Sequence, residues 1–547
     1  RVHANLITLA SSAPTANKWL SLGQLYRTAV QQQAVNAALR LKALSVYNQG
    51  LTIATKIKDK ALQSFANGYL GELYEDEQRF DDALNYSRQA LFHAQALADD
   101  TLLYRWQWQV ARVLKKQGNI SAALESYRQA VATLNRSRTS LTLGAGINFK
   151  QTVGPVFYEF ADLLLQQSAT ITDEKVKQAA LKEVVDVLEA VKLAEVEDYF
   201  DSECVLLPEQ QIKLSEINTD SAIIYPVLLA DRTELIVQLP GQIKQFTSPV
   251  KASDLRETVN QFRQKIEVYD AANSYLDAAQ SLYNWLIKPA EPMLEKSGVS
   301  TLVFIPDGPL RSIPISAFHD GEQFLIEKFA IATTPGITLT DPKPFDRENI
   351  RVLANGLSEP VQGYSALPSV KQELANIQSV FDTTLFQDAT YQLDAVEGEM
   401  SGGSYNIVHF ATHGEFSSDH SKSFLLTYDD KLTMDKLENT IGLRRFQSEP
   451  IELLVLSACQ TAVGDEQAAL GLAGIAIKAG ARSALATLWF INDQATSQLV
   501  ANFYRELSKA KQTKAKALQT AQVTMLSKTS FKHPSFWAPF LMIGNWL

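Results

Sequence analysis

The spacing of hydrophobic positions changes near Pro208 and divides the chain into two parts. In residues 1–200, large apolar residues recur at intervals of three and four, which is the spacing of one helix face. Beyond Pro208, apolar residues form short runs rich in Val, Ile and Leu, separated by turn residues. Such runs are typical of strands buried in a sheet. The pattern predicts a helical domain over residues 1–200 and an α/β domain over residues 201–547.

The helical part repeats itself every 40 residues. Ala43-Leu44, Ala83-Leu84 and Ala123-Leu124 are equally spaced, since 83 − 43 = 40 and 123 − 83 = 40. A helical hairpin with one apolar face buries that face only by stacking on its neighbours, as in a solenoid. The repeats resemble tetratricopeptide repeats (TPR), lengthened from roughly 34 residues by longer turns between repeats. A fourth unit is expected over residues 157–196.

A TPR-like solenoid presents a concave groove, and the sequence leaves two uses for it open. The groove either binds a regulatory protein or peptide, or the solenoid is a rigid spacer. Aromatic side chains that would line the groove are Tyr26, Tyr69, Tyr104, Trp106 and Trp108. Aromatic residues at helical spacing also form cores, so their role stays open.

The second part alternates strands with helices, which favours a mostly parallel sheet covered by helices. The predicted strands are 222–229 and 234–239 (a hairpin), 301–305, 324–333, 351–356, 424–428 and 483–489. The predicted helices are 253–294, 369–381, with a capping box from Ser369 to Gln372, and 470–479, ended by Gly480. Residues 201–345 make the front half of this domain and residues 346–547 the catalytic half.

Two further apolar runs each end at a reactive side chain. One is 406–414 (NIVHFATHG), which ends at His413 and Gly414, and the other is 453–461 (LLVLSACQT), which contains Cys459. The ligand crevice of an open α/β sheet lies at the carboxyl ends of its strands. Two adjacent strands would therefore bring imidazole and thiol together, although 459 − 413 = 46 residues separate them. A cysteine nucleophile needs this arrangement. His409, inside its strand, is expected to be a hydrogen-bonded core residue.

The motifs around these two residues resemble the caspase-like cysteine peptidases, and more specifically the bacterial CHAT domain. The resemblance spans about residues 205–547. Its motifs are HFATHG (409–414), SACQT (457–461), LGLAGIA (470–476), LW (488–489), IPDGPL (305–310) and HPSFWAPF (533–540). It implies a caspase-like fold in which Cys459 is the nucleophile and His413 the general base. The backbone N–H groups of Gly414 and Cys459 would form the oxyanion hole.

Three residues are candidates for the substrate pocket because the family builds it from loops beside the cysteine strand. They are Asp307, Gln460 and Asp493. Buried carboxylates at this position would favour Arg or Lys in the substrate. A second interpretation of Asp493, equally open, is the N-terminal cap of a helix that begins near Gln494.

Composition excludes several other functions. The formal charge of −9 argues against a nucleic-acid surface, and no apolar run approaches the roughly 18 residues of a membrane span. The histidines have no partners at metal-ligand spacing and no phosphate loop is present, so neither metal nor cofactor is expected. Only two cysteines occur, of which Cys204 is expected to be a core residue. This favours a reducing, cytoplasmic location. Because the sequence begins with Arg1, an exported form stays open.

We therefore expect a cysteine endopeptidase that cuts a protein substrate and is regulated by a partner on its TPR region. One alternative is a scaffold or adaptor that retains the peptidase fold without activity. Another is a hydrolase that acts on something other than peptides. Close to the C-terminus, Lys509, Lys511, Lys514 and Lys516 predict a solvated helix face.

Overall fold

The computed structural model forms two compact units, Arg1–Gln167 and Ser168–Leu547. The residues that it describes are 6, 9–32, 37–142, 152–200, 220–269, 272–341, 343–345, 347, 350–417, 420–442, 451–457, 459–461, 466, 474 and 480–547. The boundary predicted at residues 200 and 201 lies at the end of helix α10 (Glu174–Phe200), one helix beyond the division between the units.

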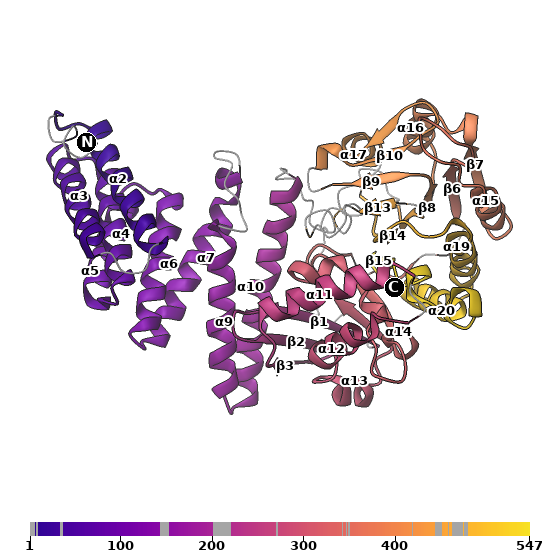
Figure 1. The fold of residues 1–547 in the computed structure, drawn as a ribbon, viewed down its shortest axis with the longest axis horizontal. Helices are drawn as coiled ribbons and strands as arrows, with labels where there is room; N and C mark the ends of the chain where they lie inside the picture. The colour runs from indigo at the N-terminus through magenta and orange to yellow at the C-terminus, as the bar shows by residue number, and fades with distance from the viewer. Residues whose placement is uncertain are drawn as a thin grey trace. The chain divides into compact units, whose positions relative to one another are not determined.

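The first unit is built from antiparallel helical hairpins, as the 40-residue period predicts (Figure 1). Its helices are α2 (Ala13–Gln32), α3 (Ala37–Lys56), α4 (Lys60–Asp76), α5 (Phe80–Gln95), α6 (Asp100–Lys116), α7 (Ile120–Thr142) and most of α9 (Gly154–Thr170). Asp59 and Asp99 cap α4 and α6, because their carboxylates accept the N–H groups of Leu62 and Leu102. The TPR-like interpretation of this region is confirmed.

The turns between these helices are short and follow a period of 20 residues. Lys58, Gln78, Ala98 and Gly118 all have positive φ angles, of 58°, 60°, 52° and 79°. Each ends one helix and leads into the next. The expectation of longer turns between repeats is wrong, because the extra length lies in the helices, which have 16 to 20 residues from α3 to α6.

Close contacts between helices hold the first unit together. A Cβ atom on Gly68 would lie 2.1 Å from the Trp106 ring, so only glycine allows α4 and α6 to pack here. Trp106 is fully buried, and its indole N–H donates to Ser64 Oγ over 2.8 Å. Trp106 is therefore a core residue and not part of a groove.

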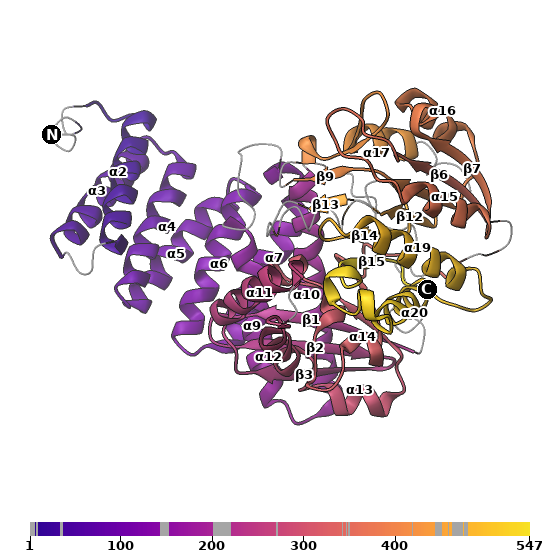
Figure 2. The same cartoon turned by 45° about the vertical axis from the view of Figure 1, so that its right-hand side comes forward.

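The second unit contains a large sheet of eleven strands (Figures 1 and 2). In spatial order they are β3 (Gln242–Ser248), β2 (Thr233–Leu239), β1 (Ser221–Leu228), β4 (Thr301–Phe304), β5 (Ala330–Thr333), β15 (Phe540–Gly544), β14 (Ser483–Thr487), β12 (Leu453–Leu456), β8 (Ile407–Ala411), β6 (Arg351–Gly356) and β7 (Asp382–Gln387). Among these neighbours only β1–β2, β2–β3 and β14–β15 are antiparallel. This confirms the predicted helical region followed by an α/β domain with a mostly parallel sheet.

Helices and a second, four-stranded sheet complete this unit. The helices are α10, α11 (Ala252–Glu267), α12 (Leu276–Leu286), α13 (Glu291–Ser297), α14 (Leu325–Lys328), α15 (Val370–Gln378), α16 (Leu393–Gly402), α17 (Met434–Gly442), α19 (Asp493–Leu507) and α20 (Lys514–Leu526). The small sheet has the order β11 (Lys431–Thr433), β10 (Phe424–Leu426), β9 (Gly414–Phe416) and β13 (Cys459–Thr461). None of the described helices could span a membrane.

Several predicted elements need correction. The helical segment 253–294 is three helices, α11 to α13, and the strand predicted over 324–333 is a short helix, α14, followed by β5. Ser369 makes no side-chain capping hydrogen bond. Lys514 is fully buried, although the lysine pattern predicts a solvated face. Gly480 has the expected left-handed φ of 70°, while Cys204 and most of the predicted helix 470–479 lie outside the described residues.

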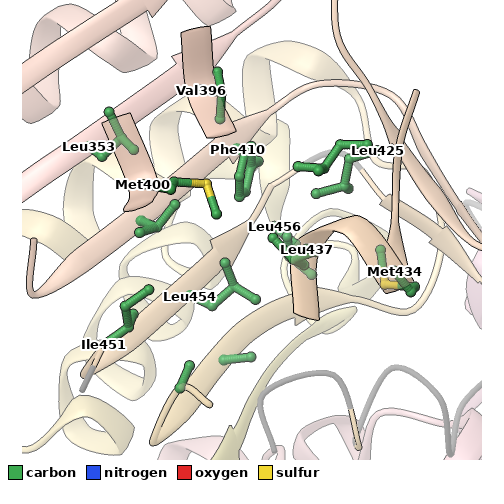
Figure 3. Close-up of a cluster of buried hydrophobic side chains, with 14 of the residues drawn as sticks. Leu353, Val396, Met400, Phe410, Leu425, Met434, Leu437, Ile451, Leu454 and Leu456 are labelled. Atoms are coloured by element: carbon green, nitrogen blue, oxygen red, sulfur yellow. The ribbon is translucent and has the colours of Figure 1, made fainter. Parts of the chain in front are cut away.

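Alternation along the strands gives the large sheet two different faces. Val408, Phe410, Leu454 and Leu456 face a hydrophobic cluster that includes residues of α16 and α17 (Figure 3). His409 points to the other face, as the period of two requires. There His409 Nε2 lies 2.9 Å from Glu373 of α15, and Nδ1 lies 3.1 Å from the Tyr504 hydroxyl of α19. His409 is thus a hydrogen-bonded core residue, as predicted.

Candidate active site

The strands that lead to His413 and Cys459 are neighbours in the large sheet. β8 and β12 run parallel, with Phe410 opposite Leu456, and the Ser457 N–H donates to the Phe410 carbonyl over 3.1 Å. Their carboxyl ends therefore lie at one edge. The apolar β-branched and leucine-rich runs explain this placement, because a strand covered on both faces must be apolar throughout.

The segments that follow β8 and β12 leave the large sheet and pair again in the small one. β9 begins at Gly414 and β13 begins at Cys459, and these two residues are opposite each other in a parallel pair. Paired strands lie about 4.8 Å apart. The backbone of Cys459 is therefore next to the residue that follows His413. This statement concerns the backbone only.

The segment that contains His413 has one extra residue between its pairing in the large sheet and its pairing in the small sheet. The paired residues differ by 456 − 410 = 46 in the large sheet and by 459 − 414 = 45 in the small one. Three residues lie between the paired positions Phe410 and Gly414, but only two lie between their partners Leu456 and Cys459. An extra residue in one of two paired strands re-aims a neighbouring side chain, as a β-bulge does. His413 lies in this interval.

The His413 ring is oriented by the loop between β6 and α15. Its Nε2 lies 2.8 Å from the Ser365 carbonyl oxygen, and the Tyr364 ring lies 5.1 Å away between centroids. A carbonyl oxygen only accepts hydrogen bonds, so Nε2 must carry the proton in the neutral ring. The lone pair is then on Nδ1, which can accept a proton from a thiol.

The backbone around His413 is fixed to β10. Leu426 donates its N–H to the His413 carbonyl over 2.8 Å, and its own carbonyl accepts the Thr412 hydroxyl over 2.7 Å. These two bonds hold Thr412 and the backbone of His413 itself. The ring therefore extends from a segment with little freedom to move.

The predicted pocket residues are engaged within the protein. Asp307, which follows β4, has its Oδ1 atom 2.6 Å from Lys192 Nζ and is 8% exposed. Asp493 accepts the Ser369 N–H over 2.6 Å, while the neighbouring Asn492 caps α19 through the Ala495 N–H. Gln460 lies in β13 opposite Glu415. Asp493 is thus in the first turn of its helix, but it is not the cap.

Two residues that orient His413 were not found from the sequence. Tyr364 and Ser365 lie in an irregular loop, and 48 residues separate Ser365 from His413. A backbone carbonyl can belong to any residue type, so no side-chain pattern marks it. The search for a carboxylate partner of His413 could not have found this contact.

A second candidate region is an open cavity of about 880 Å³ in the first unit. Acidic and basic side chains line it in equal numbers: Glu72, Glu75, Asp76, Glu159, Arg27, Arg105, Arg112 and Lys116. Tyr104 and Trp108, two of the aromatic residues whose role the sequence leaves open, also line it. Among the residues placed in this structure, no group of His, Cys, Asp or Glu side chains is arranged to hold a metal ion.

These features define a class of protein, in which TPR-like helical hairpins precede an α/β domain of the caspase-like type. Comparison with known families then identifies the α/β domain: residues 276–545 match the CHAT domain, and the chain therefore contains a CHAT domain, as the motifs predict. This match supports a caspase-like peptidase family. A comparison with curated proteins gives no significant match.

Among solved structures, the chain is similar to the Arg specific cysteine proteinase gingipain R, with 11% identity and a TM-score of 0.34 over 54% of this chain and 74% of gingipain R. A complex of the Porphyromonas gingivalis RgpB pro- and mature domains gives 10% identity and a TM-score of 0.34, over 54% and 76% of the two chains. BtubC from P. vanneervenii gives 16% identity and a TM-score of 0.23, over 34% and 81%. These are distant similarities.

Proposed function

We propose that this protein is a cysteine endopeptidase that uses His413 and Cys459 and is regulated by a partner bound to its helical repeats. The observation that carries the proposal is the register of β9 and β13, where Cys459 is opposite Gly414. The CHAT match over residues 276–545 supports the same reaction class.

In the proposed reaction, His413 Nδ1 takes the proton of the Cys459 thiol and the thiolate attacks a peptide carbonyl. The imidazolium that forms keeps its Nε2–H directed at the Ser365 carbonyl, which holds the ring in one orientation. His413 then gives its proton to the leaving amine. Water hydrolyses the resulting thioester and releases the second product.

The tetrahedral intermediate carries a negative oxygen, which backbone N–H groups stabilise. We assign this role to Gly414 and Cys459, which begin the paired strands β9 and β13. One lost donor in such a site costs about 2.7–4 kcal/mol of transition-state stabilisation. A substrate chain bound beside β9 and β13 would accept further hydrogen bonds from backbone N–H groups.

The test is the pair of substitutions Cys459→Ala and Cys204→Ala in the full chain. We expect kcat/KM on reporter peptides to fall more than 1,000-fold, on the order of a lost catalytic nucleophile, only for Cys459→Ala. His413→Ala and His93→Ala form a matched second pair, with loss expected only for His413→Ala. Equal activity of Cys459→Ala and the parent would contradict the proposal.

The silent-scaffold alternative gives a different result in a thiol-labelling experiment. A Cys459 activated by His413 reacts with iodoacetamide near neutral pH, whereas an ordinary thiol is mostly protonated there because its pKa is about 8.5. Peptide mass spectrometry separates Cys459 from Cys204. If the alkylation of Cys459 and Cys204 depends on pH in the same way, the result would support the inactive scaffold.

Reporter peptides with Arg, Lys, Leu or Asp before the cleaved bond test the specificity. We keep the prediction of Arg or Lys before the cleaved bond. Asp493 is the carboxylate to test, and one of its oxygens accepts the Ser369 N–H. Asp493→Ala should then reduce cleavage after basic residues selectively. Equal cleavage of all four peptides would remove the basic pocket.

Regulation by the helical repeats is supported by the charged cavity of the first unit, which can receive a peptide segment. We expect low basal turnover in the full chain. The fragment 168–547 is the suitable comparison because it begins where the second compact unit begins and retains α10. Equal basal turnover by the fragment and the full chain would contradict this regulation.

A further inference from the structure

Helix α10 touches the loops that follow two strands, β4 and β5. Glu189 accepts the Ile337 and Thr338 N–H groups after β5, over 3.0 and 2.8 Å. Lys192 pairs with Asp307 after β4. These contacts fix the middle of α10 against the loops that follow β4 and β5. They belong to the second unit alone.

The end of α10 reaches the histidine segment. The Tyr199 hydroxyl donates to the Ser417 carbonyl over 2.7 Å, and Ser417 lies 417 − 414 = 3 residues after Gly414. The Ser417 N–H donates to Ser423 Oγ over 3.0 Å, so this residue is held on both sides. Tyr199 is 7% exposed, which protects its hydrogen bond from competing water.

The next residue of α10, Phe200, packs against Gly474. A Cβ atom on Gly474 would lie 2.5 Å from Phe200 Cε2, so the ring lies directly on the backbone of Gly474, 474 − 459 = 15 residues after Cys459. The Tyr199 and Phe200 rings meet edge to face, with 4.8 Å between centroids. Leu193, Val196 and Leu339 complete the cluster around them. Adjacent residues of one helix thus contact Ser417, directly after β9, and Gly474.

We propose that Tyr199 is a positioning residue for the Cys459–His413 pair, with Phe200 as its hydrophobic support. The Tyr199 hydroxyl fixes the end of β9 and thereby keeps Gly414 opposite Cys459. Misplacement of a catalytic group by about 1 Å can cost about 100-fold in rate, so one hydrogen bond at this point has a large effect. This inference rests on the proposed peptidase function.

The test is Tyr199→Phe, which removes the hydroxyl and keeps the ring. The readouts are kcat and KM on a reporter peptide and the pH dependence of Cys459 alkylation by iodoacetamide, quantified by peptide mass spectrometry. We expect about a tenfold lower kcat with unchanged KM, and slower alkylation of Cys459 at pH 7. The melting temperature should change little, because the ring still fills its site.

Tyr225→Phe is the matched control. The Tyr225 hydroxyl also bonds to α10, at Glu189 over 2.9 Å, but it lies on β1. We expect Tyr225→Phe to lower the melting temperature and to leave the alkylation profile and kcat as in the parent. If Tyr199→Phe keeps the parent profile and kcat, or if Tyr225→Phe causes the same loss, the positioning role is wrong.

His413→Ala in the same alkylation assay separates this inference from the function on which it rests. A changed profile for His413→Ala with an unchanged profile for Tyr199→Phe would overturn only the positioning role. An unchanged profile for His413→Ala would overturn the catalytic pair itself.

Discussion

The cavity of the helical unit and the face of α10 are both rich in charged side chains, yet they are built differently. In the helical unit, Glu72 pairs with both Arg27 and Arg105, and Arg27 also pairs with Asp76. The Arg105 side chain is 34% exposed. On α10, Glu189 and Lys192 are 6% and 4% exposed. The first network is shared and partly hydrated, whereas the second is buried.

This difference shows which region tolerates change. Solvent and alternative partners compensate for a lost charge in the helical unit, since exposed ion pairs contribute only about 0–1 kcal/mol. On α10, Lys192 also has two partners, Asp307 and Glu195, but these groups are buried, so a removed partner leaves polar groups that water cannot reach. The cavity can therefore present its charges to a partner, while α10 holds the loops of the α/β unit.

The largest expected effect is that of Glu189→Ala. The carboxylate accepts hydrogen bonds from Tyr225, Ile337 and Thr338. Each buried donor left unpaired costs about 1–3 kcal/mol, so we expect a loss of about 3–5 kcal/mol in the second unit. Thermal unfolding measures it. Asp186→Ala removes an exposed ion pair with Lys182 on the same helix and should change the stability little. Equal losses of stability from the two variants would contradict the difference between buried and exposed charges.

Gly68→Ala tests whether close helix contacts, not charges, hold the helical unit together. The added Cβ would overlap the Trp106 ring, and overpacking of this kind costs about 1–3 kcal/mol. Faster hydrogen exchange in α4 and α6 should report it. Gly398→Ala in α16 meets no atom within 4 Å and should stabilise the second unit by about 0.5–1 kcal/mol. A neutral Gly68→Ala would contradict the packing argument.

Glu72→Ala measures how much the ion pairs of Glu72 with Arg27 and Arg105 contribute to stability. We expect a loss of about 1–2 kcal/mol, between the values for exposed and buried ion pairs, because Arg27 keeps Asp76 and Arg105 keeps its contacts with the Tyr69 and Trp106 rings. Thermal unfolding of the full chain gives the value. Asp82→Ala, from an exposed pair with Arg79, is the control. A loss as large as that of Glu189→Ala would show that redundancy does not protect this network.

Lys514→Met tests how the stability of the second unit depends on pH. Burial lowers the pKa of Lys514 from 10.5 to about 7. It faces Glu452, Arg482, Arg347 and Asp341. Below pH 7 both the folded and unfolded states hold the proton. Between pH 7 and 10.5 only the unfolded state holds it, so stability rises with pH by up to about 1.4 kcal/mol per unit. Lys514→Met should remove this rise, and Lys516→Met should keep it.

The parts of the molecule that sequence patterns predicted well are those with a strict period. The 40-residue repeat identified the helical hairpins, and continuous apolar runs identified β6, β8 and β12 with their buried faces. The period of two also placed His409 inside the core. A buried strand or helix face must be apolar at regular intervals, so such elements are visible without a structure.

Irregular and charged features were predicted poorly. The apolar segment 324–333 predicts a strand, yet four of its ten residues form α14. Lys514 was expected in solvent but is fully buried, and the cap interpretation of Asp493 is wrong because Asn492 caps α19. In each case a partner from a distant part of the chain decides the environment of the residue.

The sequence by itself determined the two kinds of architecture, the CHAT motifs and the two residues, His413 and Cys459, on which the proposed chemistry depends. Only the tertiary structure decided that the Ser365 carbonyl orients the imidazole and that Tyr199 reaches the end of β9. The physical reason is that periodic burial is recorded in residue type along one element, whereas a hydrogen bond to a backbone carbonyl is formed by any residue that the fold brings there.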